Sequence, residues 1–133
     1  MSVRVFVPVS RADLQTLVTE RRLPGPRLAH ALTDALREAW PGVDQEEGEY
    51  AALMAAAAAS RALGSAEEGR RRRVLAVDAP DAVPTGSEDP TEVRIVGDVA
   101  WRDVAAAHVD LADDAAEDDD LAWFATQEIP DLG

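Results

Sequence analysis

The arrangement of apolar and polar residues near the N-terminus predicts one strand followed by one helix. The run from Val3 to Val9 is rich in valine and predicts an internal β-strand. Pro8 cannot donate to a strand ladder, so the strand is expected to end there. Ser10 then provides a helix N-cap, with Asp13 placed to complete a capping box. The helix is expected to end at the proline-rich break of residues 23–26.

The longest helical pattern of the chain extends from Glu49 through a run of alanines to Leu63. Alanine has the highest intrinsic helix propensity, and its small side chain lets a helix approach a sheet closely. We expect Asp44 to cap this helix at its start and Gly64 at its end. Helical spacing places five side chains on one face, namely Tyr50, Leu53, Met54, Ala57 and Arg61. This stripe is interpreted as part of the core, and the alternative is that it faces a ligand.

Residues 28–40 admit two interpretations. The apolar spacing suits a single helix, but Arg27 to Thr33 alternates enough to form a short strand. In the second interpretation a short helix extends from Thr33 to Trp40, and the ability of Thr33 to act as N-cap favours this interpretation. Pro41 and Gly42 end the element in either case.

The second half of the chain predicts strands separated by loops rather than further helices. Apolar residues predict strands over three ranges, Arg73 to Asp78, Thr91 to Val96 and Val104 to Leu111. The segment from Ala79 to Pro90 contains three prolines and a glycine, so it is expected to be a surface loop. Val99 to Asp103 is expected to form a short turn or a single helical turn that tucks Trp101 inward.

The C-terminal part combines a charge run with a return of hydrophobicity. Six of the eight residues from Asp113 to Asp120 are acidic, so we expect residues 112–120 to form a flexible segment without anchors. Residues 121–129 alternate again and predict a final strand that contains Trp123 and Phe124. Because aromatic side chains bury large apolar areas, this strand is expected to dock on the body of the domain.

Together these elements predict an α+β fold in a single globular domain over residues 1–133. The length suffices for one hydrophobic core. We expect a mixed or antiparallel sheet of about five strands, with two or three helices packed mainly on one face and the helix around Leu53 in the middle.

Composition and charge narrow the classes of function. The chain has 133 residues and a formal net charge of -13, and from Asp110 to the C-terminus nine acidic residues occur without a basic one. This balance argues against binding to nucleic acid or to an anionic membrane. The absence of cysteine and lysine excludes thiol nucleophiles, thiolate zinc sites, Schiff-base lysines and a Walker-type lysine. With no apolar run of about 18 residues and no signal-peptide pattern, a cytoplasmic location is expected.

Two carboxylates at the end of a predicted strand are candidates for catalysis. Asp78 and Asp81 flank Pro80, and oxygen ligands of this kind bind divalent ions such as Mg²⁺. The alternative is a turn in which both side chains cap backbone amides. No metal site is predicted, since the only two histidines, His30 and His108, lie far apart in the sequence.

Three further groups carry candidate chemistry. His108 lies two residues from Asp110 in a predicted strand, hence on the same face, and this pairing would tune a general base. Glu128 is either a buried functional acid or an outward-facing strand residue. The cluster from Arg70 to Arg73 either holds a phosphate or pairs with the acidic segment, and pairing is the favoured interpretation because the whole molecule repels polyanions.

The small number of candidate catalytic residues favours a small accessory or protein-interaction domain without catalysis. No HExxH, GxSxG or Walker motif occurs, and no cofactor is expected. Such a domain would bind a protein partner, or a second copy of itself, through a sheet edge or through Trp123 and Phe124.

Two alternatives remain open. One is a small metal-assisted hydrolase or transferase that uses the strand-end carboxylates Asp78 and Asp81 with one histidine. The other is a small-ligand site beside the central helix, in a pocket lined by Tyr50 and Trp101.

Five short segments together suggest a relationship to other proteins. They are Val-Arg-Val-Phe-Val-Pro near the N-terminus, Glu-Tyr-Ala-Ala-Leu in the central helix, Arg-Arg-Arg-Val, Val-Ala-Ala-Ala-His-Val-Asp, and the terminal Trp-Phe-Ala-Thr-Gln-Glu-Ile-Pro-Asp-Leu. This set resembles a family of small uncharacterised actinobacterial proteins. The resemblance covers most of the chain and implies a cytoplasmic, single-domain protein. It assigns no catalytic residue, because the role of that family is unknown.

Overall fold

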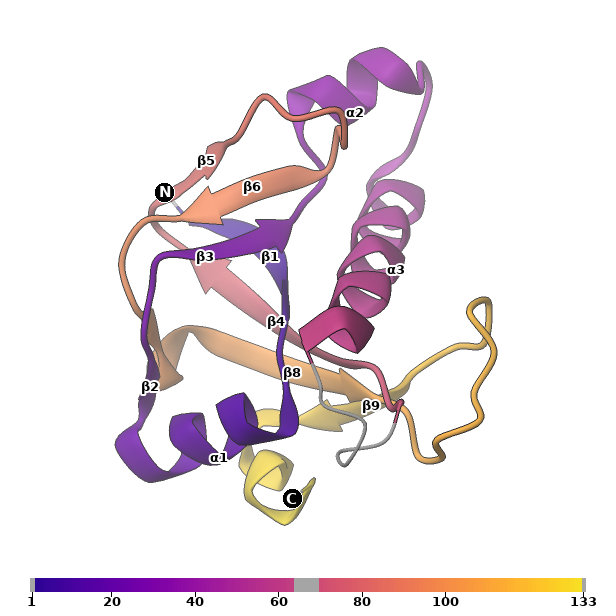
Figure 1. The fold of residues 1–133 in the computed structure, drawn as a ribbon. Coiled ribbons are helices and arrows are strands. Elements are labelled where there is room, and N and C mark those ends of the chain that lie inside the picture. The colour runs from indigo at the N-terminus through magenta and orange to yellow at the C-terminus, as the bar shows by residue number, and fades with distance from the viewer. Residues whose placement is uncertain (1, 64–69, 133) are drawn as a thin grey trace.

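A seven-stranded antiparallel sheet forms the centre of the protein, in the strand order β5-β6-β3-β1-β4-β8-β9 (Figure 1). The structure is a computed structural model that describes residues 2–63 and 70–132. The strands of this sheet are β1 (Val3–Pro8), β3 (Arg27–His30), β4 (Arg73–Ala79), β5 (Ala82–Pro84), β6 (Glu92–Ile95), β8 (Val104–Val109) and β9 (Ala122–Ala125). A smaller sheet pairs β2 (Arg22–Leu23) with β7 (Val99–Ala100). The helices are α1 (Arg11–Glu20), α2 (Asp34–Ala39) and α3 (Gln45–Leu63), followed by the 3₁₀ helices η2 (Trp101–Asp103) and η3 (Thr126–Leu132).

The predicted α+β class is confirmed, and local capping explains where the first helices begin. The Oγ of Ser10 accepts the backbone amide of Asp13 at 3.1 Å, and the Asp13 carboxylate accepts the amide of Ser10 at 3.0 Å. Thr33 caps α2 by accepting the amide of Leu36 at 3.0 Å. The interpretation of residues 28–40 as a strand followed by a helix is therefore confirmed.

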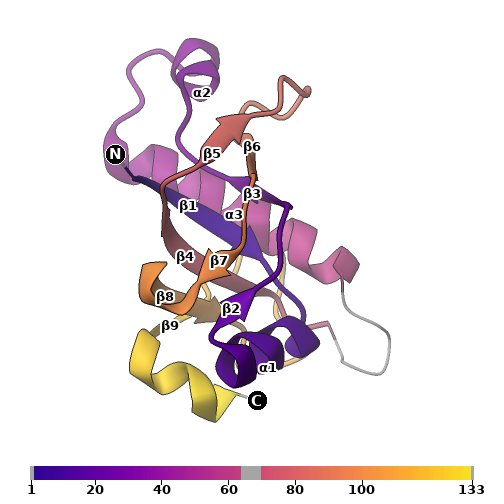
Figure 2. The ribbon, with the colours of Figure 1, turned by 90° about the vertical axis from the view of Figure 1, so that its left-hand side faces the viewer.

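Helices cover both faces of the sheet, so the prediction that they pack mainly on one face is wrong. Successive side chains of β1 point to opposite faces. Val5 and Val7 are buried in a core that contains Leu14 and Leu17 of α1, whereas Phe6 is buried in a core formed with the alanines of α3. Figure 2 shows α3 behind the sheet and the small β2–β7 sheet in front of it. The sequence pattern of each helix gives no indication of which face it will cover.

Helix α3 packs on the sheet through its smallest side chains. Its buried residues are Gly48, Ala52, Ala56, Ala57 and Ser60. The Oγ of Ser60 donates to the carbonyl of Val9 at 2.8 Å and accepts the amide of Arg73 at 2.9 Å, which ties the helix to β1 and β4. Most of the predicted apolar stripe flanks this face instead of forming it, and Tyr50 is exposed. Small residues form the face because they allow the closest approach of helix and sheet.

The ends of α3 were predicted from two capping residues. Asp44 caps the start, where its carboxylate accepts the amide of Glu47 at 2.7 Å and its own amide donates to the Glu47 carboxylate at 3.2 Å. This prediction is confirmed. The predicted cap at Gly64 lies outside the described residues.

The structure has more strands than the five predicted. Strand β5 lies inside the segment from Ala79 to Pro90 that was predicted to be a loop, and its last residue is Pro84. Proline fits there because β5 is an edge strand whose outer backbone groups need no partner strand. Strands β2 and β7 have two residues each, too few to show a periodicity in the sequence.

The C-terminal strand is shorter than the predicted range of residues 121–129. Strand β9 ends at Ala125, and η3 follows with Pro130 inside it. Ile129 of η3 is buried in the same core as Leu14 and Leu17 of α1. Trp123 and Phe124 thus lie in a short strand, and a 3₁₀ helix follows it. The chain leaves the strand because Ile129 packs in the core on the α1 side of the sheet.

Candidate functional site

A buried ion pair joins the residue before β4 to the residue after β8. Arg72 is only 1% exposed and Asp110 only 5%. The Arg72 side chain donates to both oxygens of the Asp110 carboxylate, at 2.8 and 2.9 Å, and the Arg72 amide donates at 2.8 Å. Hydrogen bonding to Asp110 raises the pKa of the Arg72 guanidinium further above its ordinary value. Among basic side chains this bidentate geometry is specific to arginine. The pair therefore fixes the position where the chain leaves β8.

The same arginine holds the acidic segment, here defined as residues 113–120. Its guanidinium donates to the backbone carbonyls of Glu117 at 3.0 Å and Asp119 at 2.7 Å. Arg71 forms an ion pair with Asp113 at 3.0 Å. The favoured interpretation of the arginine cluster, pairing with the acidic segment, is therefore confirmed.

Helix α3 supplies two more contacts to the acidic segment. The hydroxyl of Tyr50 donates to the Asp120 carboxylate at 3.0 Å, and this bond raises the pKa of the tyrosine. The Arg61 guanidinium donates to the carbonyl of Ala115. In Figure 1 the segment is the loop that leaves the body beyond β8 and returns to β9. The expectation of a segment without anchors is wrong, because its anchors come from residues distant in the sequence; its flexibility stays a prediction.

Strand β9 presents one large aromatic side chain to solvent. Among the strands that the structure describes it pairs only with β8, and Trp123 lies opposite His108 in the register. Trp123 is 61% exposed, whereas its neighbour Phe124 is half-buried. We call the strand Ala122–Ala125 together with the acidic segment the β9 surface. It combines an exposed tryptophan, an open strand edge and a concentration of carboxylates.

The two strand-end carboxylates bind different partners. Asp78 pairs with Arg4 at 2.8 Å, and Asp81 accepts the amide of Gly97 at 2.7 Å. Each carboxylate thus has a structural partner, and the role of Asp81 is the amide cap considered as the alternative. In the parts of the chain that the structure describes, no group of three or more histidine, aspartate or glutamate residues could hold a metal ion.

The predicted pairing of His108 with Asp110 is not formed. Asp110 is occupied by Arg72, and the His108 ring packs edge-on against Phe6, with ring centroids 6.3 Å apart. Burial, together with the positive charge of Arg4, lowers the pKa of His108. His108 therefore belongs to the packing of the sheet face beside Trp123 and not to an acid–base pair.

Glu128 and Trp101 also have local structural partners. Glu128 lies on η3, not in a strand, and its carboxylate accepts the amide of Ala125 at 2.9 Å. The Arg21 guanidinium stacks on Trp101 at 4.4 Å from the ring centroid, and Trp101 packs against the core on the α1 side. Tyr50 lies on α3, across the sheet from that core. The prediction of a pocket lined by both Tyr50 and Trp101 is therefore wrong.

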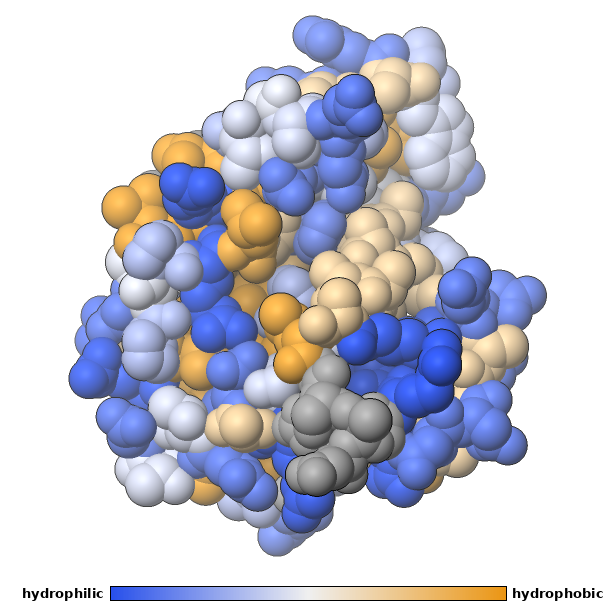
Figure 3. All heavy atoms as spheres, in the orientation of Figure 1, coloured by the Kyte–Doolittle hydropathy of each residue, from blue (hydrophilic) through white to orange (hydrophobic). Residues whose placement is uncertain are grey.

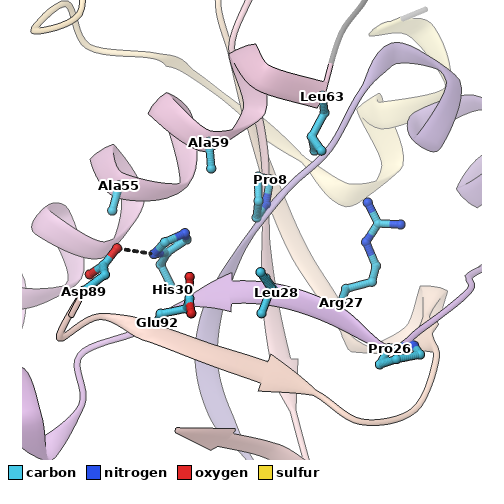
Figure 4. Close-up of a pocket in the computed structure, with 10 residues that line it drawn as sticks. All are labelled: Pro8, Pro26, Arg27, Leu28, His30, Ala55, Ala59, Leu63, Asp89 and Glu92. Carbon is cyan, nitrogen blue, oxygen red and sulfur yellow. Dashed lines mark ion pairs between the residues drawn. The ribbon is translucent and has the colours of Figure 1, made fainter. Parts of the chain in front are cut away.

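A groove does lie beside the central helix, but other residues line it. It occupies about 480 Å³ between α3 and β3. Its apolar wall consists of Pro8, Leu28, Ala55, Ala59 and Leu63, and its polar end of His30, Asp89 and Glu92 (Figure 4). In Figure 3 apolar atoms, in orange and beige, gather around a hollow near the centre of the face. Sequence reasoning missed this site because its residues come from four separate segments; the only signal was His30 within an apolar strand.

Acidification is expected to destabilise the protein through its two histidines. Burial lowers the pKa of both His30 and His108, so the unfolded chain takes up these protons at a higher pH than the folded one. The free energy of unfolding should therefore fall as the pH decreases below about 6.5, the ordinary value of histidine. Urea unfolding at neutral pH and at pH values between 5 and 6.5 measures this change.

The matched control is the double variant His30→Asn and His108→Asn, which carries no histidine. It should lose most of the pH dependence in this range, since Asp98, whose pKa is lowered by the Gly25 amide and by Arg22, titrates at more acidic pH. A free energy of unfolding that rises on acidification in the parent protein would contradict this account.

The geometry defines an α+β domain with helices on both faces of an antiparallel sheet, an anchored acidic segment and two accessible candidate surfaces. The chain belongs to the Family of unknown function (DUF6912), whose pattern matches residues 3–132. The resemblance to an uncharacterised family is thus confirmed. Comparison with curated proteins and with solved structures finds no match. Within residues 2–63 and 70–132, no helix has the length and apolar character needed to cross a membrane.

Proposed function

We propose that this protein is a non-catalytic interaction domain of the cytoplasm that binds an extended, basic segment of a partner protein along the β9 surface. The observation that carries the proposal is Trp123, which is 61% exposed on an edge strand. Tryptophan is enriched among the residues that dominate binding energies in protein interfaces. The unpaired backbone groups of an edge strand accept an added strand from a partner.

The two edges of the sheet differ in their capacity to bind a strand. Strand β5 has three residues and ends in Pro84, which lacks an amide donor. Strand β9 has four residues and contains no proline. Its outward-facing backbone is therefore the better template, and Trp123 adds a large apolar contact beside it.

Charge complementarity supports a basic partner. Arg72 holds the acidic segment through the backbone carbonyls of Glu117 and Asp119, and the Glu117 carboxylate forms no ion pair with any described residue. Asp114 and Asp118 are exposed and form no ion pair with any described residue. The segment is thus held in one place while much of its charge faces solvent. Lysine or arginine residues of a partner would meet both this charge and the face of Trp123.

A labelled short peptide that alternates lysine and valine tests the proposal by fluorescence anisotropy. We expect Trp123→Ala to weaken its binding by about tenfold or more, because the substitution removes the central apolar anchor. Raising the salt concentration should weaken binding further by screening the carboxylates.

Trp40→Ala is the matched control, since Trp40 is also exposed but lies after α2, away from the β9 surface. It should leave the affinity unchanged. The proposal is wrong if the peptide does not bind, if a peptide that alternates glutamate and valine binds equally well, or if the two tryptophan variants behave alike.

A further inference from the structure

We propose that the groove between α3 and β3 is a second binding site, for a small organic ammonium ion with an apolar body. This site is independent of the β9 surface, since it lies on the other side of α3 and shares no residue with it. Its volume, about 480 Å³, is in the range of sites for small molecules.

The hydrogen bonds around His30 determine which of its nitrogens carries the proton. Thr91 Oγ1 donates its only hydrogen to the Asp89 carboxylate at 2.7 Å, so it accepts from Nδ1 of His30, 2.8 Å away. The second Asp89 oxygen lies 3.4 Å from the same Nδ1. Because burial lowers its pKa, His30 is neutral at neutral pH, and its Nε2 is then a hydrogen-bond acceptor.

That acceptor faces the groove. His30 is only 5% exposed, yet its Nε2 forms no hydrogen bond with any described residue. Every fully buried side-chain nitrogen or oxygen of the described residues has a partner, so Nε2 is not fully buried, and His30 is one of the residues that line the groove. Figure 4 shows this nitrogen on the side of the ring turned away from Asp89, below α3. A buried ring held by two partners is thus arranged to accept a hydrogen bond from a bound molecule.

The polar end of the groove carries uncompensated negative charge. Glu92 is held by Thr85, whose Oγ1 donates to one carboxylate oxygen at 2.8 Å, and its other oxygen has no partner among the described residues. Asp89 contributes a second carboxylate. Among the described residues that line the groove, Arg27 is the one cation, and it is already paired with Asp13 at 2.8 Å. A ligand that donates hydrogen bonds and carries positive charge therefore complements this end.

The remainder of the groove fits an apolar body. Ala55, Ala59 and Leu63 project from α3, and Leu28 and Pro8 project from the sheet opposite them (Figure 4). These side chains carry no hydrogen-bonding group, so they favour carbon over water. The site thus pairs an apolar channel with acceptors at one end, which is the complement of a protonated alkyl or aryl amine.

Three probes that share a phenylethyl body test the charge preference by NMR titration of the ¹⁵N-labelled protein. They are 2-phenylethylammonium, the neutral 2-phenylethanol and the anionic 3-phenylpropionate. We expect the ammonium probe to bind most tightly, with shifts concentrated at Ala55, Ala59, His30 and Thr91. The inference is overturned if the three probes bind equally, if the anion binds best, or if the ammonium probe shifts only residues of β9 or none up to its solubility limit.

Two variants test the assigned acceptors. Glu92→Gln removes the charge but keeps an oxygen for Thr85. It should lower the affinity for the ammonium probe by on the order of tenfold and leave the affinity for the alcohol unchanged. His30→Asn keeps a donor at the position of Nδ1 and removes the acceptor Nε2, so it should lower the affinity for both probes. Glu38→Gln, on the exposed side of α2, is the control and should change neither. Unchanged ammonium binding in Glu92→Gln contradicts the inference even if the histidine variant fails to fold.

Discussion

Replacing Arg72 with methionine should lower the free energy of unfolding by about 3–5 kcal/mol, because Asp110 would remain buried without its partner. Arg72 is 1% exposed, and its guanidinium also donates to the carbonyls of Glu117 and Asp119. The substitution therefore removes at once the ion pair and the anchor of the acidic segment. Urea unfolding at neutral pH measures the loss.

Arg71→Met is the matched control for this substitution. Arg71 pairs with Asp113 at 3.0 Å, but both side chains are largely exposed to solvent, and such surface pairs contribute about 0–1 kcal/mol. The double variant Arg72→Met and Asp110→Leu should recover part of the stability, since it leaves no buried charge unpaired. Equal losses in Arg71→Met and Arg72→Met would show that the buried pair is not formed in solution.

The second large effect is expected at the centre of β4. Leu75 is fully buried among the side chains on the α1 side of the sheet. Leu75→Ala should lower the free energy of unfolding by about 2–5 kcal/mol, from lost burial and from the cavity that remains. Chemical unfolding of the variant beside the parent protein measures the difference.

The same substitution at an exposed leucine is the control for the core. Leu111 is 68% exposed, so Leu111→Ala should change the stability by no more than about 0.5 kcal/mol. If both variants lose the same amount, the assignment of β4 to the core is wrong.

Capping residues in the sequence predicted where the helices begin, because a helix cap is formed by residues close together in the chain. The capping residues Ser10, Thr33 and Asp44 fixed where the three helices begin, and each of these caps is present. The alanine run predicted α3 but not its buried face. The sheet determines that face, because Ala52 and Ala56 can approach it more closely than Tyr50 could.

The candidate surfaces depend on tertiary contacts that cannot be inferred from local sequence patterns. Arg72 is one of four consecutive arginines, and nothing in the pattern distinguishes it as the one that is buried against Asp110. Trp123 was predicted in a docked strand, whereas exposure of its side chain depends on β9 being the outermost strand. The groove at His30 assembles residues from β1, β3, α3, the start of β6 and the segment before it. Only the tertiary fold brings such residues together.

The most direct test of the proposed function is to locate the peptide that alternates lysine and valine on the ¹⁵N-labelled protein by chemical-shift mapping. The account predicts that the largest amide shifts fall on β9 and on the acidic segment. The edge strand β5 should be unaffected, and shifts in the α3–β3 groove, which can take a lysine side chain, should be smaller. Shifts that cluster on β5 or in the groove, with β9 unchanged, would contradict the claim that the β9 surface is where this protein meets a partner.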